Sequence, residues 1–130
     1  MILGARAYAT TQIQTASPVQ VVVLLYDGTI QAMKLAQEGI RNNHREDKAR
    51  FLGRALRVVS ELSATLNMEE GGAVAQDLRR IYEFVIYELT QANMLNQAER
   101  LDAPIRCLAV IREAWQELAT QVQKPQAVGM

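Results

Sequence analysis

The chain has 130 residues, of which 49% are hydrophobic and 5% aromatic, and its 14 basic and 14 acidic residues give a formal net charge of zero. This length suits one domain with a single hydrophobic core. The charge balance argues against a protein whose surface as a whole attracts nucleic acid or an anionic membrane, since such proteins usually carry a large basic excess. Seven glycines and three prolines are few for an all-β fold, so the composition favours helices.

The single cysteine and the single histidine limit the chemistry of the chain. Cys107 has no second cysteine with which to form an internal disulfide, and His44 cannot join a cysteine cluster around a metal ion. A reducing, cytosolic location is therefore expected. No apolar run reaches the roughly 20 residues of a membrane span. The N-terminus also lacks the pattern of a signal peptide, so we expect no export of the chain itself.

Hydrophobic residues recur with helical periodicity in four segments, at about residues 17–40, 47–66, 72–96 and 102–121. The clearest helix start is Ser17-Pro18-Val19-Gln20. Ser17 can cap the helix with its hydroxyl, Pro18 suits the first helical position, and Gln20 completes a capping box.

Short polar linkers between long helices favour antiparallel neighbours. We therefore predict an all-α fold, an antiparallel four-helix bundle over residues 17–122. Residues 1–16 are predicted to form a flexible N-terminal arm or a short cap helix, and residues 123–130 a disordered tail.

No arrangement of residues favours catalysis, a cofactor or a metal ion. Cys107 has no histidine near it in the sequence and is interpreted as a structural thiol. Gly71-Gly72 lacks the spacing and the lysine of a phosphate-binding loop. A di-iron bundle would need histidines facing inward from its helices, and the only histidine lies in a predicted loop. We therefore predict that the protein is not an enzyme.

The segment 17–40 is unusual because it carries two apolar stripes. The first is sufficient to face a bundle core and contains Val19, Val22, Val23, Tyr26, Ile30 and Met33. The second lies roughly opposite and contains Val21, Leu24, Leu25, Gly28, Ala32, Leu35, Ala36 and Gly39. Either the rest of the bundle or the arm covers this second side, or it is a groove for a partner, and periodicity favours neither interpretation. Phe84 and Tyr87 fall off the main stripe of segment 72–96 and hint at a further contact surface.

Several motifs follow one another in an order and spacing typical of a known family. They are Thr15-Ala16-Ser17-Pro18, Leu25-Tyr26-Asp27-Gly28, Gly71-Gly72-Ala73-Val74-Ala75, Gln91-Ala92-Asn93 and Arg112-Glu113-Ala114-Trp115. On these residues the chain resembles the flagellar secretion chaperone family FliS over about residues 8–118. Tyr8 lies where that family usually has a tyrosine.

This resemblance implies a cytosolic helical bundle that binds the C-terminal segment of flagellin, prevents premature polymerisation, and helps deliver flagellin to the flagellar type III export gate. It also implies that Tyr8 contacts an export-gate component. A homodimer in the absence of cargo is left open, since the sequence does not give the oligomeric state. Together with the apolar pattern, it predicts a flagellin groove lined by Val21, Leu24, Leu25, Gly28, Ala32, Leu35, Phe84 and Tyr87.

One alternative comes from the charge pattern. Residues 41–57 contain six basic and two acidic residues. This segment would suit a helical adaptor that binds a regulator protein or nucleic acid through Arg41, Arg45, Lys48, Arg50, Arg54 and Arg57.

Overall fold

The computed structural model describes residues 17–123, and the side chains of residues 17–121. In chain order it contains α2 (Pro18–Arg41), α3 (Arg45–Ala64), α4 (Met68–Leu95), the short 3-10 helix η1 (Ala98–Leu101) and α5 (Asp102–Gln123). No strand occurs in this part of the chain. The predicted all-α bundle is therefore confirmed. The predicted arm and most of the predicted tail lie outside the described residues.

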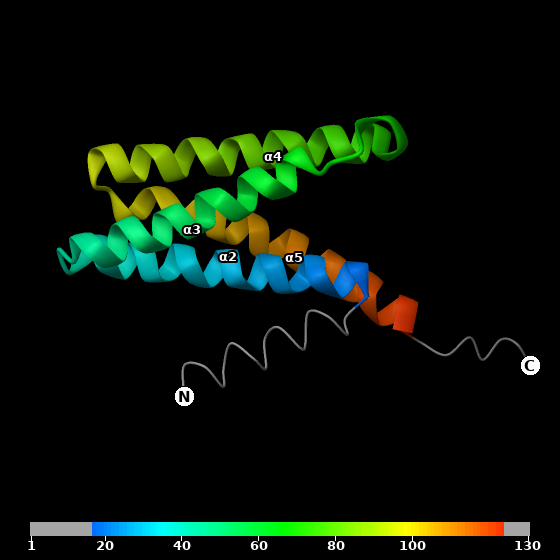
Figure 1. Ribbon diagram of the computed structural model, residues 1–130, viewed down its shortest axis with the longest axis horizontal. Helices are drawn as coiled ribbons and strands as arrows, with labels where there is room; N and C mark the ends of the chain where they lie inside the picture. Colours follow the sequence, from blue (N-terminus) through cyan, green and yellow to red (C-terminus); the bar gives the residue numbers. More distant parts are fainter. Residues whose placement is uncertain (1–16, 124–130) are drawn as a thin grey trace, which may run out of the picture.

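The helices lie side by side, and each runs antiparallel to the one before it in the chain (Figure 1). α2 packs along both α3 and α5, and α3 packs along α4. α4 and α5 come close at few positions and are joined through η1. α2 and α4 do not pack directly along one another, so they occupy diagonal corners of the bundle.

The helix starts follow local sequence signals. At α2, the Ser17 hydroxyl accepts from the backbone N–H of Gln20, and the Gln20 side chain accepts from the backbone N–H of Ser17, both at 3.2 Å. This confirms the predicted capping box. At α4, the Asn67 side chain accepts from the backbone N–H of Glu70 at 3.0 Å, and α4 begins at Met68. The sequence placed this start four residues later, at Gly72.

Gly72 explains the difference. Its φ of 51° and ψ of −129° interrupt the regular helix between the turn that starts at Met68 and the rest of α4. Only glycine adopts this backbone conformation without strain, because it has no Cβ. The Gly71-Gly72 pair is thus a kink inside α4 rather than the linker before it.

Polar side chains tie α2 to the C-terminal part of the fold. Gln37 is 7% exposed, and its amide donates to the Ala98 carbonyl at 3.0 Å and to the Asp102 carboxylate at 2.8 Å. The Arg112 guanidinium donates to both carboxylate oxygens of Asp27, at 2.7 and 3.3 Å. The hydrogen bonds to Asp27 and then to Glu113 raise the pKa of Arg112. α5 is therefore held against α2 at two levels of the bundle.

The core lies between all four helices. Its largest fully buried side chains include Tyr26, Met33, Val59, Tyr82, Val85, Leu101 and Leu108. None of the helices in the described part of the chain is long and apolar enough to cross a lipid bilayer.

Candidate partner-binding surfaces

The outer side of α2 keeps part of the apolar surface that the sequence predicted. Val21, Leu24, Leu25 and Leu35 are half-buried, and Gly28 is exposed. A Cβ built on Gly28 would meet no atom of the described residues within 4 Å. Within the described part of the chain, the space above this part of α2 is therefore open, beside a row of partly accessible apolar side chains. We call Val21, Leu24, Leu25, Gly28 and Leu35 the α2 face.

Two small residues of the same stripe serve the bundle instead. Ala32 is 1% exposed and belongs to the core cluster. A Cβ on Gly39 would lie 2.8 Å from the backbone nitrogen of Lys48, so α3 approaches α2 closely at that point. The prediction that Ala32 lines an open groove is therefore wrong, because the core encloses its methyl group. Ala32 and Gly39 are small residues buried where helices pack together, whereas Gly28 faces outward.

Phe84 and Tyr87 form a separate surface on α4, where they are 41% and 57% exposed. Met94, further along the same helix, is 70% exposed. At 100° per residue, these three side chains share the side of α4 opposite its buried residues Val85 and Leu89. We call Phe84, Tyr87 and Met94 the α4 face. Because α2 and α4 occupy diagonal corners, the predicted groove residues lie on two surfaces and do not form one groove.

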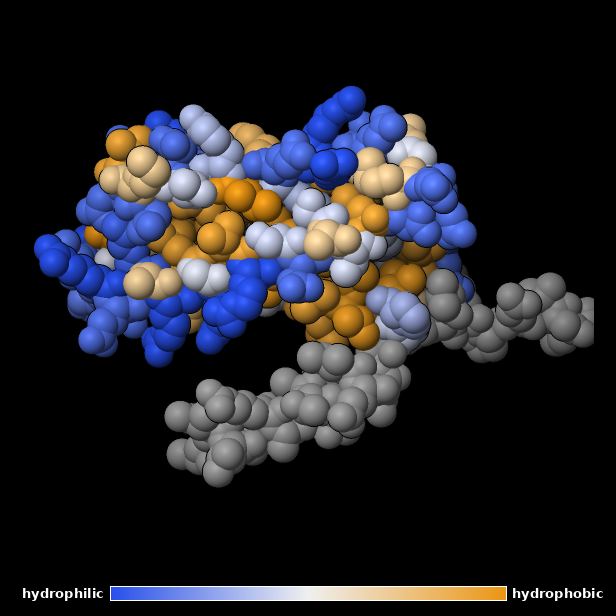
Figure 2. All heavy atoms as spheres, turned by 45° about the horizontal axis from the view of Figure 1, so that its top comes forward, coloured by the Kyte–Doolittle hydropathy of each residue, from blue (hydrophilic) through white to orange (hydrophobic). Residues whose placement is uncertain are grey.

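The sequence did not predict a depression that lies between α3 and α4. It is lined by Ala49, Leu52, Gly53, Leu56, Leu89, Thr90 and Asn93 and has a volume of about 280 Å³. Figure 2 shows apolar side chains in the hollow between two bands of hydrophilic residues. Leu56, at 37% exposed, is its most accessible large apolar side chain. Sequence periodicity assigns Leu52 and Leu89 to a core, and cannot indicate that two helix edges leave a gap between them.

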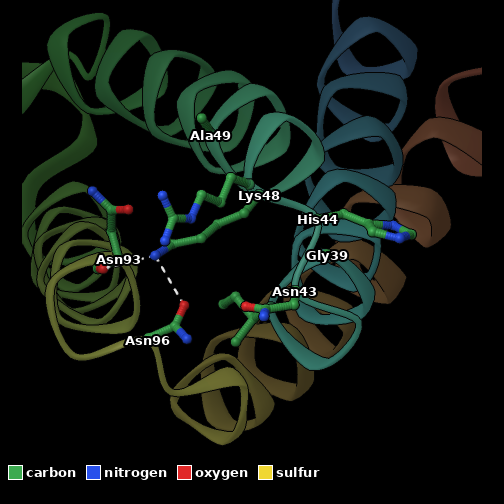
Figure 3. Close-up of a pocket in the computed structure, with 9 residues that line it drawn as sticks. Gly39, Asn43, His44, Lys48, Ala49, Asn93 and Asn96 are labelled. Carbon is green, nitrogen blue, oxygen red and sulfur yellow. Dashed lines mark hydrogen bonds between the residues drawn. The ribbon is translucent and has the colours of Figure 1, made fainter.

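A larger and more polar hollow of about 430 Å³ lies where α2 ends and α3 begins, facing the end of α4 (Figure 3). It is lined by Gly39, Ile40, Asn43, His44, Arg45, Lys48, Ala49, Asn93 and Asn96. The Lys48 ammonium crosses from α3 to α4 and donates to the Asn93 carbonyl at 3.1 Å and the Asn96 side-chain oxygen at 3.0 Å. In Figure 3 the His44 ring points away from these groups.

Two arginines of the basic segment 41–57 lie over an aromatic ring. The guanidinium groups of Arg50 and Arg54 lie 4.7 and 5.5 Å from the centroid of the Phe51 ring. Arg50 also pairs with Asp47 at 3.1 Å. The adaptor function assigned to this segment stays a prediction.

Among the described residues, no three His, Cys, Asp or Glu side chains are placed to hold a metal ion.

The sequence is similar over most of its length to known flagellar proteins. The family model described as "Flagellar protein FliS" matches residues 1–122. The flagellar secretion chaperone FliS of Vibrio cholerae is 32% identical over 108 residues, which cover 83% of this chain and 79% of that protein. The FliS proteins of Salmonella typhimurium and Campylobacter jejuni are 31% and 33% identical, covering 89% of this chain and 90% and 91% of their own lengths.

Proposed function

The chain belongs to the FliS family of flagellar secretion chaperones, and we propose that its cargo is the C-terminal segment of flagellin. In this proposal the protein acts in the cytosol, keeps flagellin from polymerising there, and helps deliver it to the flagellar type III export gate.

The observation that carries the proposal is the pair of accessible apolar surfaces on a chain with no net charge. A bundle needs only one apolar side on each helix, yet α2 keeps the α2 face and α4 keeps the α4 face. Apolar surfaces of this kind suit an amphipathic segment that docks with its own apolar stripe. A flagellin tail that buries such a stripe only in the filament would otherwise self-associate.

The separation of the two surfaces sets a condition on the cargo. They lie on diagonal helices, so one segment reaches both only if it passes around the bundle. Ordering a disordered segment costs conformational entropy, and a large contact area offsets that cost. We therefore propose an extended, wrapped complex in which the α2 face and the α4 face contact different parts of the same tail.

Gly28→Gln tests the α2 face without touching the core, because a side chain at Gly28 enters open space. We expect this variant to bind a flagellin C-terminal peptide about tenfold more weakly in calorimetry, equivalent to roughly 1.4 kcal/mol. Ala114→Gln, at an exposed position on α5, is the matched control and should bind like the wild type. Unchanged affinity of Gly28→Gln, with unchanged helical circular dichroism, would show that the α2 face does not bind cargo.

The identity of the cargo needs its own experiment. The purified chaperone should bind monomeric flagellin of the same organism and suppress the rise in light scattering that accompanies filament growth. A flagellin that lacks its C-terminal segment should neither bind nor be affected. Filament growth at the normal rate, with the chaperone in excess over full-length flagellin, would contradict the proposal.

A further inference from the structure

The depression between α3 and α4 and the polar hollow form one continuous feature. Ala49 and Asn93 line both of them. The shared residues join an apolar stretch, which contains Leu56 and Leu89, to an end that contains Lys48 and Arg45. We call the whole feature the α3–α4 channel. It lies away from the α2 face, so it requires its own explanation.

The polar end of the channel offers hydrogen-bond donors without a matching anion. Among the described side chains, neither Lys48 nor Arg45 pairs with a carboxylate; the ion pairs in that region involve other residues. The Lys48 ammonium has three N–H donors. Two of them reach the neutral oxygens of Asn93 and Asn96, and neither oxygen compensates the positive charge. Asn43 and Asn96 add side-chain amides to the lining.

The charges and the size of this end suit the carboxylate at the end of a peptide. Gly39, Ile40 and Asn43 line it on the α2 side, so the end of α2 and the loop after it form a third wall of this hollow. Its volume of about 430 Å³ lies within the range of pockets that enclose small ligands. A peptide that lies between α3 and α4 can therefore bring its terminal carboxylate to Lys48 and Arg45.

We propose that the polar hollow binds the C-terminal carboxylate of a peptide that lies in the α3–α4 channel, with Lys48 and Arg45 as the charged partners. The apolar stretch beside Leu56 receives apolar side chains of the same peptide. This inference rests on the proposed function, since it identifies the peptide as the end of the flagellin tail. It adds a direction: the tail lies with its terminus at the α2–α3 loop and its preceding residues toward the far end of α3.

The experiment uses one flagellin C-terminal peptide in two forms, with a free carboxylate and with a C-terminal amide. Both are titrated calorimetrically into the wild type, Lys48→Met and Lys34→Met. Methionine keeps the length of the lysine stem without its charge, and Lys34 is an exposed lysine of α2 that does not line the channel. We expect the wild type and Lys34→Met to bind the free acid about five- to tenfold more tightly than the amide, a typical effect of a partly exposed charge pair. In Lys48→Met this ratio should fall to about one.

Lys48 also joins α3 to α4, so its loss can act through the structure. A purely structural role would weaken both peptide forms equally and leave their ratio unchanged, which would overturn the inference. Arg45→Gln, which does not break the Lys48 hydrogen bonds, should also reduce the ratio, whereas Arg106→Gln on α5 should leave it unchanged. Equal affinity of the wild type for acid and amide would overturn the inference and leave the proposed function standing. Failure of the wild type to bind either form would contradict the proposed function itself.

Discussion

The hydroxyl of Tyr26 on α2 lies 2.6 Å from the hydroxyl of Tyr82 on α4. The two rings meet edge to face, with 6.4 Å between their centroids, and the residues are 0% and 2% exposed. Since α2 and α4 do not pack directly along one another, this hydrogen bond links the diagonal helices through the centre of the core. Each hydroxyl satisfies the other in a region that water does not reach.

Tyr26→Phe should lower the free energy of unfolding by about 1–3 kcal/mol, because it leaves the buried Tyr82 hydroxyl without this partner. The double variant Tyr26→Phe with Tyr82→Phe should cost less than the sum of the two single changes, since no orphaned hydroxyl then remains. Urea denaturation of the wild type, the two single variants and the double variant provides this comparison. Additive losses would show that the two hydroxyls do not depend on each other.

The same pair predicts how stability responds to alkaline pH. Burial raises the pKa of Tyr82 and of Tyr26 above the ordinary value of 10.0, so the folded protein keeps both protons where the unfolded chain releases them. The stability from these groups is complete below pH 10 and is lost as the pH rises from there through the folded-state pKa. Urea midpoints measured from pH 8 to pH 11.5 should fall less steeply for Tyr82→Phe than for the wild type. If the urea midpoints of the two proteins fell with pH at the same rate, the buried Tyr82 hydroxyl would not contribute to the alkaline loss of stability.

Gly39→Ala should destabilise the fold by about 1–3 kcal/mol, because the new methyl group would lie 2.8 Å from the Lys48 backbone nitrogen and force α2 and α3 apart. Gly28→Ala is the matched control on the same helix, where the methyl enters open space. It should stabilise the helix by roughly 0.5–1 kcal/mol through its better helix propensity. Thermal and urea unfolding measure both. Equal effects of the two changes would show that α3 does not approach α2 at Gly39.

Tyr8 lies outside the described residues, and the proposed contact with the export gate rests on the family resemblance. We expect Tyr8→Ala to keep the helical circular dichroism and the affinity for the flagellin tail, and to reduce flagellin export and binding to the cytosolic export-gate component. Tyr87→Ala, at an exposed site on α4, is the comparison for loss of a tyrosine from the proposed cargo surface. Loss of cargo affinity in Tyr8→Ala would place this tyrosine in cargo binding instead.

Local sequence predicted the helices well where the signals are local. The capping box at Ser17 lies within one helical turn, and the stripe with Tyr26 and Met33 follows from a period of 3.6 residues. The start of α4 was wrong by four residues because Gly71-Gly72 reads as a linker. The cap at Asn67 begins an earlier helical turn, and the conformation of Gly72 makes a kink between that turn and the rest of α4. Helix caps and hydrophobic periodicity both depend on residues that are close together in the chain.

The sequence by itself determined an all-α fold, a first long helix with apolar residues on two sides, and the family resemblance. Only the tertiary structure decided which of those residues stay accessible. Periodicity places Ala32 and Gly28 on one stripe, yet the core encloses Ala32 and leaves Gly28 open. Lys48 and Asn93 are 45 residues apart, and their meeting at the channel end depends on how α3 packs on α4. Helical periodicity depends on neighbouring residues, whereas burial and cavities depend on the distances between helices that are remote in the chain.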